Sequence, residues 1–161
     1  MIVYQTEPNF TVILPGPCQA RCEFCIEPEG PSPDSAKHWL SHLRTVVADL
    51  PPPFRIVSIS GGEPTLSPVL LPALEILKAS GRFQRVVLTT NGHFKNTMRH
   101  MDALTKVVTH VNLSRHAAND IDHRTIFKTN HVPDKSQTRE IIEAFNKSGI
   151  PVNLNCCQTT S

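Results

Sequence analysis

The sequence of 161 residues has no segment suited to a membrane. Met1 to Val12 lacks the charged start and the long apolar stretch of a secretory signal, and no run approaches the roughly 18 apolar residues of a membrane span. A basic run is also missing, because the formal net charge of +2 comes from interspersed charges. Composition therefore gives no electrostatic case for nucleic acid. We expect a cytoplasmic protein without a membrane partner.

The five cysteines do not fit a disulfide framework, because their number is odd and three of them are clustered. Cys18, Cys22 and Cys25 form a C-x3-C-x2-C pattern. Three thiolates so close together can hold a soft metal or an iron–sulfur cluster and still leave one position unfilled. A catalytic metal site keeps such an open coordination position, whereas a purely structural site has all its positions filled by protein ligands. The sequence thus predicts a reactive metal centre.

Neither an internal repeat nor a linker is visible, and the length suits one domain with its own core. Period-two and helical patterns alternate along the chain. The expected strands are 10–14, 55–60, 85–90, 107–114 and 151–157, and the expected helices are 36–50, 68–80, a short one around 98–104 and one around 141–148. A further helical turn is expected around 122–127. This order predicts an α/β fold of parallel strands, as a partial barrel or an open doubly wound sheet.

Two details of these elements are specific. The second helix is expected to have Ser67 as its N-cap and Pro68 as its first residue, and to end at Gly81 in a left-handed conformation. Polar residues recur at every second position of three strands, and they are Ser58, Ser60, Asn112, Ser114, Asn153 and Asn155. A dry polar face is costly, so this face is expected to line a wet cavity or a polar ligand.

Two turns follow expected strands directly. Gly61-Gly62-Glu63-Pro64 ends the second strand, and Thr90-Asn91-Gly92 closes the third. The two glycines of the first turn allow a ligand to approach the backbone, although a tight turn alone would also require glycine. The Asn-Gly pair is itself a common turn sequence.

The cysteine pattern with Phe24 before its third cysteine, followed by Gly61-Gly62-Glu63-Pro64 and Thr90-Asn91-Gly92, resembles the radical S-adenosylmethionine (SAM) superfamily over nearly the whole chain. The resemblance implies a partial (β/α) barrel. It also implies an enzyme in which Cys18, Cys22 and Cys25 hold a [4Fe-4S] cluster whose fourth iron is chelated by SAM. Reductive cleavage of SAM would give methionine and a 5′-deoxyadenosyl radical that takes hydrogen from a substrate.

The same resemblance implies further residues and partners. SAM contacts would come from Phe24, Gly61, Gly62, Glu63, Pro64, Asn91, Ser114 and Arg115. The Arg115 guanidinium suits a carboxylate, although a solvated loop charge is an equal alternative. A flavodoxin or ferredoxin would donate electrons, and the substrate would be an unidentified small molecule or peptide. No catalytic residue is assigned.

Several alternatives stay open. The three cysteines could close a zinc site with His116 or Cys157, or the chain could be a silent remnant that binds without catalysis. It could also be a glycyl-radical activating enzyme acting on a partner protein. A sixth strand is missing from the pattern, so we expect an incomplete core domain, with a partner or second copy covering the open sheet edge. Cys156 and Cys157 are expected on the last strand, with Cys157 facing the cavity.

Overall fold

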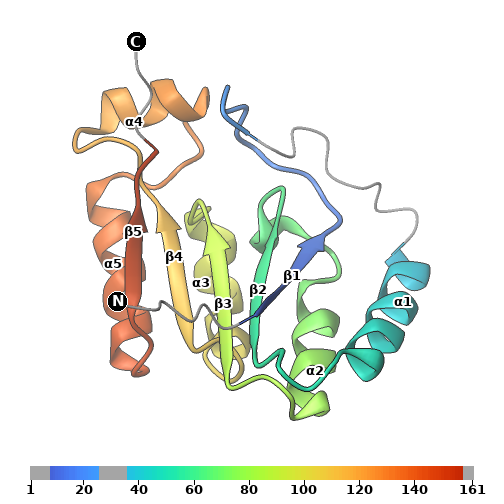
Figure 1. The fold of residues 1–161 in the computed structure, drawn as a ribbon. Coiled ribbons are helices and arrows are strands. Elements are labelled where there is room, and N and C mark those ends of the chain that lie inside the picture. The colour runs from blue at the N-terminus through green and yellow to red at the C-terminus, as the bar shows by residue number, and fades with distance from the viewer. Residues whose placement is uncertain (1–7, 26–35, 158–161) are drawn as a thin grey trace, which may run out of the picture.

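The computed structural model describes residues 8–25 and 36–157, which form a parallel sheet with helices packed on it (Figure 1). The strands are β1 (Asn9–Leu14), β2 (Ile56–Gly61), β3 (Arg85–Thr90), β4 (His110–Ser114) and β5 (Val152–Asn155). The helices are α1 (Ala36–Asp49), the 3-10 turn η2 (Pro64–Leu66), α2 (Leu70–Ser80), α3 (Phe94–Leu104), α4 (Asp120–Phe127) and α5 (Lys135–Lys147). These elements confirm the predicted α/β fold.

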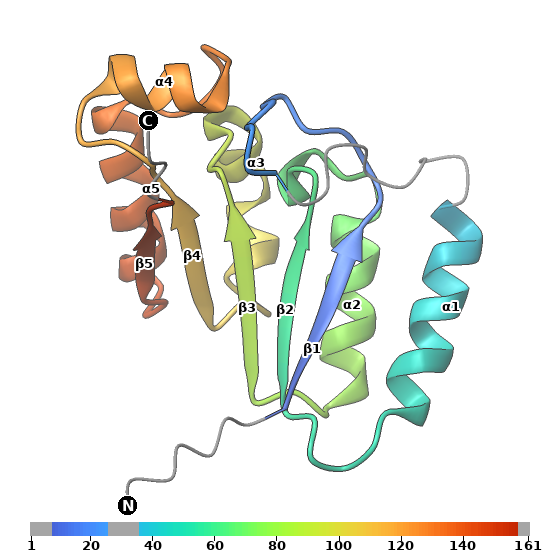
Figure 2. The ribbon, with the colours of Figure 1, turned by 45° about the horizontal axis from the view of Figure 1, so that its top comes forward.

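The strands lie in sequence order, β1-β2-β3-β4-β5, and every neighbouring pair is parallel. Helices α1, α2, α3 and α5 lie on one side of the sheet, with α1 packed on α2 and α3 on α5. Figure 2 shows that α4 and the segment after β1 lie across the carboxyl ends of the strands. Ligands of open parallel α/β sheets bind at the carboxyl ends of the strands, so the functional site is expected at this edge of the sheet.

The core lies between the sheet and the helices. Alternate strand residues point into it, and Val57, Ile59, Leu88, Val111 and Leu113 are fully buried. They belong to one hydrophobic cluster with residues of α2 and α5. This burial explains why β-branched and leucine residues alternate along β2, β3 and β4.

The opposite face of the sheet is polar and is not covered by the described helices (Figure 2). Ser58, Ser60, Asn112 and Ser114 are half-buried on it, whereas Asn153 and Asn155 at the β5 edge are exposed. The prediction of one polar face shared by three strands is confirmed. A partial barrel has such an inner face, and its hydroxyl and amide groups are open to hydrogen bonding.

Helix α2 and strand β4 begin later than predicted. Helix α2 begins at Leu70 with Val69 as its N-cap, although the Ser67 hydroxyl accepts from the Val69 amide at 3.4 Å and donates to the Pro15 carbonyl at 2.5 Å. Its end was predicted correctly, since Gly81 has φ +62° and follows the last residue. Strand β4 begins at His110 instead of residue 107 because Val107 and Val108 donate their amides to Leu104 and so extend the end of α3.

Of the described helices, none is both long enough and apolar enough to cross a bilayer.

Candidate functional site

The segment after β1, residues 15–25, carries three cysteines and is called the cysteine loop below. It lies across the carboxyl ends of the central strands (Figure 2). Two backbone hydrogen bonds fix it from opposite sides: Glu63 donates its amide to Pro17 at 3.1 Å, and Arg21 donates to the carbonyl of Phe127 at 3.0 Å. The loop therefore joins the turn after β2 to the end of α4.

Gly61 and Gly62 allow this loop to approach β2. A Cβ atom on Gly61 would lie 2.5 Å from the Leu14 carbonyl oxygen, and Gly61 has φ +149°. A Cβ atom on Gly62 would lie 2.8 Å from the Pro17 carbonyl oxygen. Both distances are too short for any other residue, so the chain itself requires these glycines beside the cysteine loop. The sequence had indicated a ligand as the reason for this close approach.

Glu63 anchors the turn after β2 and is only 1% exposed. Its Oε1 accepts hydrogen bonds from the Thr65 amide at 3.1 Å, the Thr65 hydroxyl at 2.7 Å and the Thr90 hydroxyl at 2.5 Å. Its Oε2 accepts from the Asn91 amide at 2.8 Å. A carboxylate has about four acceptor positions, and these donors match that number. We had expected Glu63 to accept from a bound ligand; in the structure it joins the ends of β2 and β3.

Asn91 links the end of β3 to the first cysteine. Its side-chain oxygen accepts from the Gln19 amide group at 2.8 Å and from the His93 backbone amide at 3.1 Å. Its Nδ2 group donates to the Cys18 sulfur at 3.6 Å. Asn91 therefore does more than form an Asn-Gly turn, because it positions Cys18.

The three thiols of the loop are close enough to affect one another's ionisation. Burial, together with the nearby Cys18 and Cys25, raises the pKa of Cys22 to about 11. Burial also raises the pKa of Cys18, where Glu63 and Cys25 add repulsion and the amide of Ala20 opposes it. Three thiolates at this place repel one another unless a positive group lies between them. Their chemistry suits a soft metal centre.

Phe24, from the same loop, belongs to a row of aromatic rings. Its ring meets the His116 ring edge-on with centroids 4.9 Å apart, and His116 stacks on Phe127 at 4.7 Å. His123 contacts Phe127 edge-on at 4.8 Å. Burial lowers the pKa of His123 to about 4, with the Arg115 charge adding to the effect. The sequence signal for this row is weak, because its members are widely separated.

Arg115 is engaged within the chain. Its guanidinium pairs with Asp120 at 2.5 Å and donates to the carbonyls of Pro133 and Ala118 and to the Thr138 hydroxyl. The predicted contact of Arg115 with a SAM carboxylate stays a prediction; the carboxylate beside it in the structure is Asp120, at the start of α4. Ser114, at the end of β4, stays half-buried on the polar face.

Cys156 and Cys157 were placed on the last strand, but β5 ends at Asn155. Both cysteines are exposed. The Cys156 thiol lies 3.4 Å from the His116 carbonyl oxygen, and the Cys157 amide donates to Nδ1 of His116 at 3.1 Å. The argument from alternating strand residues therefore does not apply to them.

The zinc alternative required three cysteines and a fourth ligand around one ion. Among residues 8–25 and 36–157, no three His, Cys, Asp or Glu side chains gather closely enough to hold a single metal ion. The thiols are near one another without converging on one point. This spread is unlike a tetrahedral zinc site, whose four ligands lie within about 2.3 Å of the ion.

The family model for the radical SAM superfamily matches residues 12–160. The chain belongs to this superfamily. Radical SAM proteins are typically enzymes, and the family implies a [4Fe-4S] cluster and SAM. The family also accounts for the order of motifs along the strand ends.

Three similar proteins illustrate the relationship. The GTP 3′,8-cyclase of Pasteurella multocida is 36% identical over 80 residues, which are 47% of this chain and 23% of that protein. The structure of SuiB from Streptococcus suis bound to S-adenosylmethionine has a TM-score of 0.67 at 20% identity and covers 95% of this chain and 33% of SuiB. The structure of anSMEcpe with bound AdoMet gives 0.65 at 19% identity, covering 92% and 43%. The chain spans less than half the length of each of these proteins.

The donor set of the cysteine loop fits the cluster that the family implies. The three thiols lie near enough to affect one another's ionisation, and a cluster would bind each of them through a separate iron. The loop carries one cysteine for each of three irons, so its donor set suits such a cluster.

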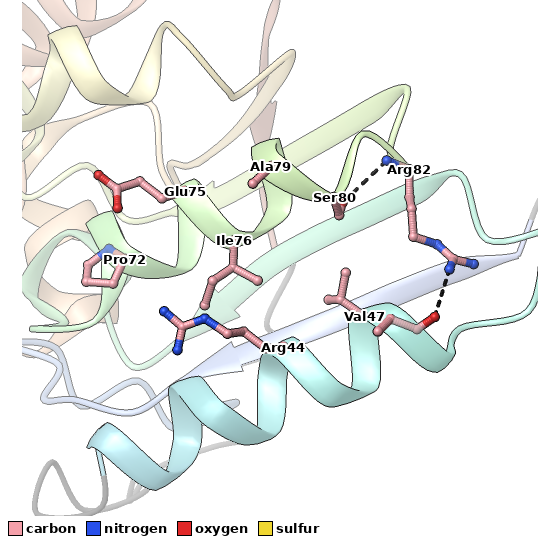
Figure 3. A pocket seen from close by; sticks show the side chains of 9 residues that line it. Arg44, Val47, Pro72, Glu75, Ile76, Ala79, Ser80 and Arg82 are labelled. Atoms are coloured by element: carbon pink, nitrogen blue, oxygen red, sulfur yellow. Dashed lines mark hydrogen bonds between the residues drawn. The ribbon is translucent and has the colours of Figure 1, made fainter.

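A groove of about 610 Å³ lies between α1 and α2, on the helical side of the sheet (Figure 3). Its floor includes Val47 and Ile76, with Arg44 and Glu75 beside them. Arg82 at one end donates to the carbonyls of Ala48 and Leu50, so it caps α1. The radical SAM motifs do not contribute to this groove.

Proposed function

We propose that this chain is the core of a radical SAM enzyme in which Cys18, Cys22 and Cys25 hold a [4Fe-4S] cluster. When bound, the cluster supplies one electron that cleaves SAM into methionine and a 5′-deoxyadenosyl radical, which takes hydrogen from a substrate. The observation that carries the proposal is the placement of a loop with three cysteines against Gly62, whose Cβ would lie 2.8 Å from the Pro17 carbonyl oxygen of that loop.

The residues of the chain bind and orient in this proposal. Gly61 and Gly62 present their backbone beside the cysteine loop, where the SAM amino group requires acceptors. Glu63 and Pro64 belong to that turn, which the Glu63 carboxylate joins to the end of β3, and Asn91 positions the Cys18 thiol. The backbone groups of this turn suit the amino acid part of SAM.

Two more residues would orient the remainder of SAM. Phe24 is half-buried on the loop and presents an apolar ring beside the thiols, and Ser114 offers a hydroxyl at the end of β4. We assign the first to packing and the second to a polar contact with SAM. Arg115 is left out because its guanidinium is engaged with Asp120.

The substrate would lie over the polar face of the sheet. Ser60 and Thr89 lie near the carboxyl ends of their strands on this face, and Thr89, Asn112 and Asn153 are adjacent in register. Hydroxyl and amide groups suit a substrate with hydrogen-bonding groups, either a small molecule or a peptide. The peptide class is supported by the likeness to SuiB, whose structure with the precursor peptide SuiA has a TM-score of 0.68. Electrons would come from a flavodoxin or a ferredoxin.

A second candidate is a glycyl-radical activating enzyme, which uses the same cofactors on a partner protein. The open β5 edge favours a partner, because β5 is paired only with β4 among the described strands. The two candidates share the first half of the reaction and differ in where the hydrogen atom is taken.

The test is anaerobic reconstitution with iron and sulfide, followed by dithionite, SAM and measurement of 5′-deoxyadenosine. The purified chain is compared with the variant Cys18→Ala, Cys22→Ala, Cys25→Ala and with the matched control Cys156→Ala, Cys157→Ala. Deoxyadenosine that disappears only in the first variant supports the proposal. Equal product from both variants, or iron binding that survives loss of the three loop cysteines, contradicts it.

A further inference from the structure

His116 lies two residues beyond β4 and is 8% exposed. Its ring and its backbone contact three segments that are distant in the sequence. The ring meets Phe24 of the cysteine loop edge-on, and it stacks on Phe127 at the end of α4. Its Nδ1 accepts from the amide of Cys157, which follows β5, at 3.1 Å. One side chain therefore contacts the loop, a helix end and a strand end.

The hydrogen bond from Cys157 determines the state of the ring. Nδ1 can accept only when it carries no proton, so the neutral ring has its proton on Nε2. Burial lowers the pKa of His116, which favours this neutral form near pH 7. His123 supports the arrangement from behind, because its Nδ1 accepts from the His116 backbone amide at 3.3 Å. The position of the ring is thus fixed from both sides.

Among residues 8–25 and 36–157, the half of the cysteine loop around Phe24 makes few hydrogen bonds to the rest of the fold. Cys18 is held by Asn91 and the Arg21 amide donates to the Phe127 carbonyl, but the segment from Cys22 to Cys25 makes one internal backbone hydrogen bond, from Cys25 to Cys22 at 3.1 Å. The ion pair of Glu23 with Lys128 at 2.6 Å is exposed and so contributes little. The ring contact of Phe24 with His116 therefore joins this half of the loop to the segment after β4.

We propose that His116 is a positioning residue that holds the Cys22–Cys25 half of the cysteine loop and the Cys156–Cys157 segment in a fixed relation to each other. Its ring holds the loop through Phe24, and its Nδ1 holds the segment after β5. The inference rests on the proposed function only where it treats this loop as the cofactor-bearing one. Placement of two cluster ligands then depends on the last strand of the sheet.

The two contacts of His116 can be removed separately. His116→Phe keeps a ring against Phe24 and loses the acceptor for Cys157, whereas His116→Asn keeps an acceptor and loses the ring. His116→Ala loses both. His110→Phe is the control, because His110 is a half-buried histidine at the opposite end of β4 from His116. Each protein is examined first without iron, by alkylation of every cysteine followed by mass spectrometry and by hydrogen exchange.

In the iron-free protein, His116→Asn is expected to raise the alkylation rates of Cys22 and Cys25 about tenfold, the usual effect of losing one buried contact, and to leave Cys18 unchanged. His116→Phe is expected to raise exchange at the Cys157 amide about tenfold with little change in the loop. His116→Ala should do both, and His110→Phe neither. Unchanged alkylation in His116→Ala, or an equal rise at Cys18 as well, overturns the proposal.

A second readout uses the reconstituted protein. The electron paramagnetic resonance spectrum of the reduced cluster, and its change on addition of SAM, should differ from the parent in His116→Asn and should be restored towards it in His116→Phe. A spectrum identical to that of the parent in all three His116 variants contradicts the positioning role. If no cluster forms even in the parent, the proposed function fails, but the alkylation pattern still decides the role of His116.

Discussion

Glu63 offers the sharpest test of how the site is built. Replacement by glutamine keeps the shape of the side chain and leaves one carbonyl oxygen, which can take the place of Oε1 with its three donors. The new amide group then faces the Asn91 amide, 2.8 Å from the present Oε2, so that donor meets donor. Neutral hydrogen bonds are weaker than charged ones by about 1 kcal/mol, and one unsatisfied buried donor costs about 1–3 kcal/mol.

Glu63→Gln should therefore lower the free energy of unfolding by about 3 kcal/mol, which corresponds to a fall in Tm of about 6–12 °C for a chain of this size. Urea unfolding can be followed by circular dichroism and by the fluorescence of Trp39, the single tryptophan. Glu75→Gln is the control, because Glu75 is exposed on α2. A Glu63→Gln protein within about 0.5 kcal/mol of the parent would refute the reasoning, since the cost of burying the charge would then cancel its hydrogen bonds.

Three other substitutions test separate parts of the account. Gly62→Ala should destabilise the chain by more than about 2 kcal/mol, because its Cβ would lie 2.8 Å from a loop carbonyl. Gly81→Ala should cost only about 1 kcal/mol, because nothing lies within 4 Å of its Cβ. Similar losses for the two variants in chemical unfolding would contradict this. Arg115→Met should lower the free energy of unfolding by about 2–3 kcal/mol, because the contacts of Arg115 with Asp120 and with two carbonyl groups are lost. The SAM affinity of the reconstituted protein, measured by calorimetry, should stay unchanged. The pKa of His123 in the folded chain is about 4, below the ordinary 6.5, so the unfolded chain takes up this proton at a higher pH than the folded chain does. The free energy of unfolding should therefore fall by about 3 kcal/mol as the pH drops from 6.5 to 4. A His123→Phe protein with the same pH profile argues against that cause.

Local patterns were sufficient for most of the fold. The five strands and the main helices could be predicted because apolar residues alternate or recur at helical spacing within each of them. A boundary was wrong where backbone hydrogen bonds extended the preceding element. Strand β4 begins at His110 because the amides of Val107 and Val108 donate to the Leu104 carbonyl at the end of α3.

The site was predictable as a set of motifs, and less so in what each residue contacts. Cys18, Gly61 and Asn91 do lie together at the carboxyl ends of neighbouring strands, as parallel topology requires. Two partners of Glu63, Thr90 and Asn91, are 27 and 28 residues away, so the sequence does not reveal that its carboxylate is already engaged by both. Arg115 shows the opposite case, because its partner Asp120 is only five residues away yet depends on how α4 begins.

The network around Glu63 also determines which residues must be transferred together if this site is moved into another protein. The cysteine loop is not a separable insert, because its path past Gly62 is open only where that residue has no side chain. Its first thiol is held by Asn91, whose backbone in turn is held by Glu63. A designer who grafted only the residues from Cys18 to Cys25 onto a new parallel sheet would transfer the ligands without their alignment. The transferable unit is the loop together with the ends of the two strands beneath it.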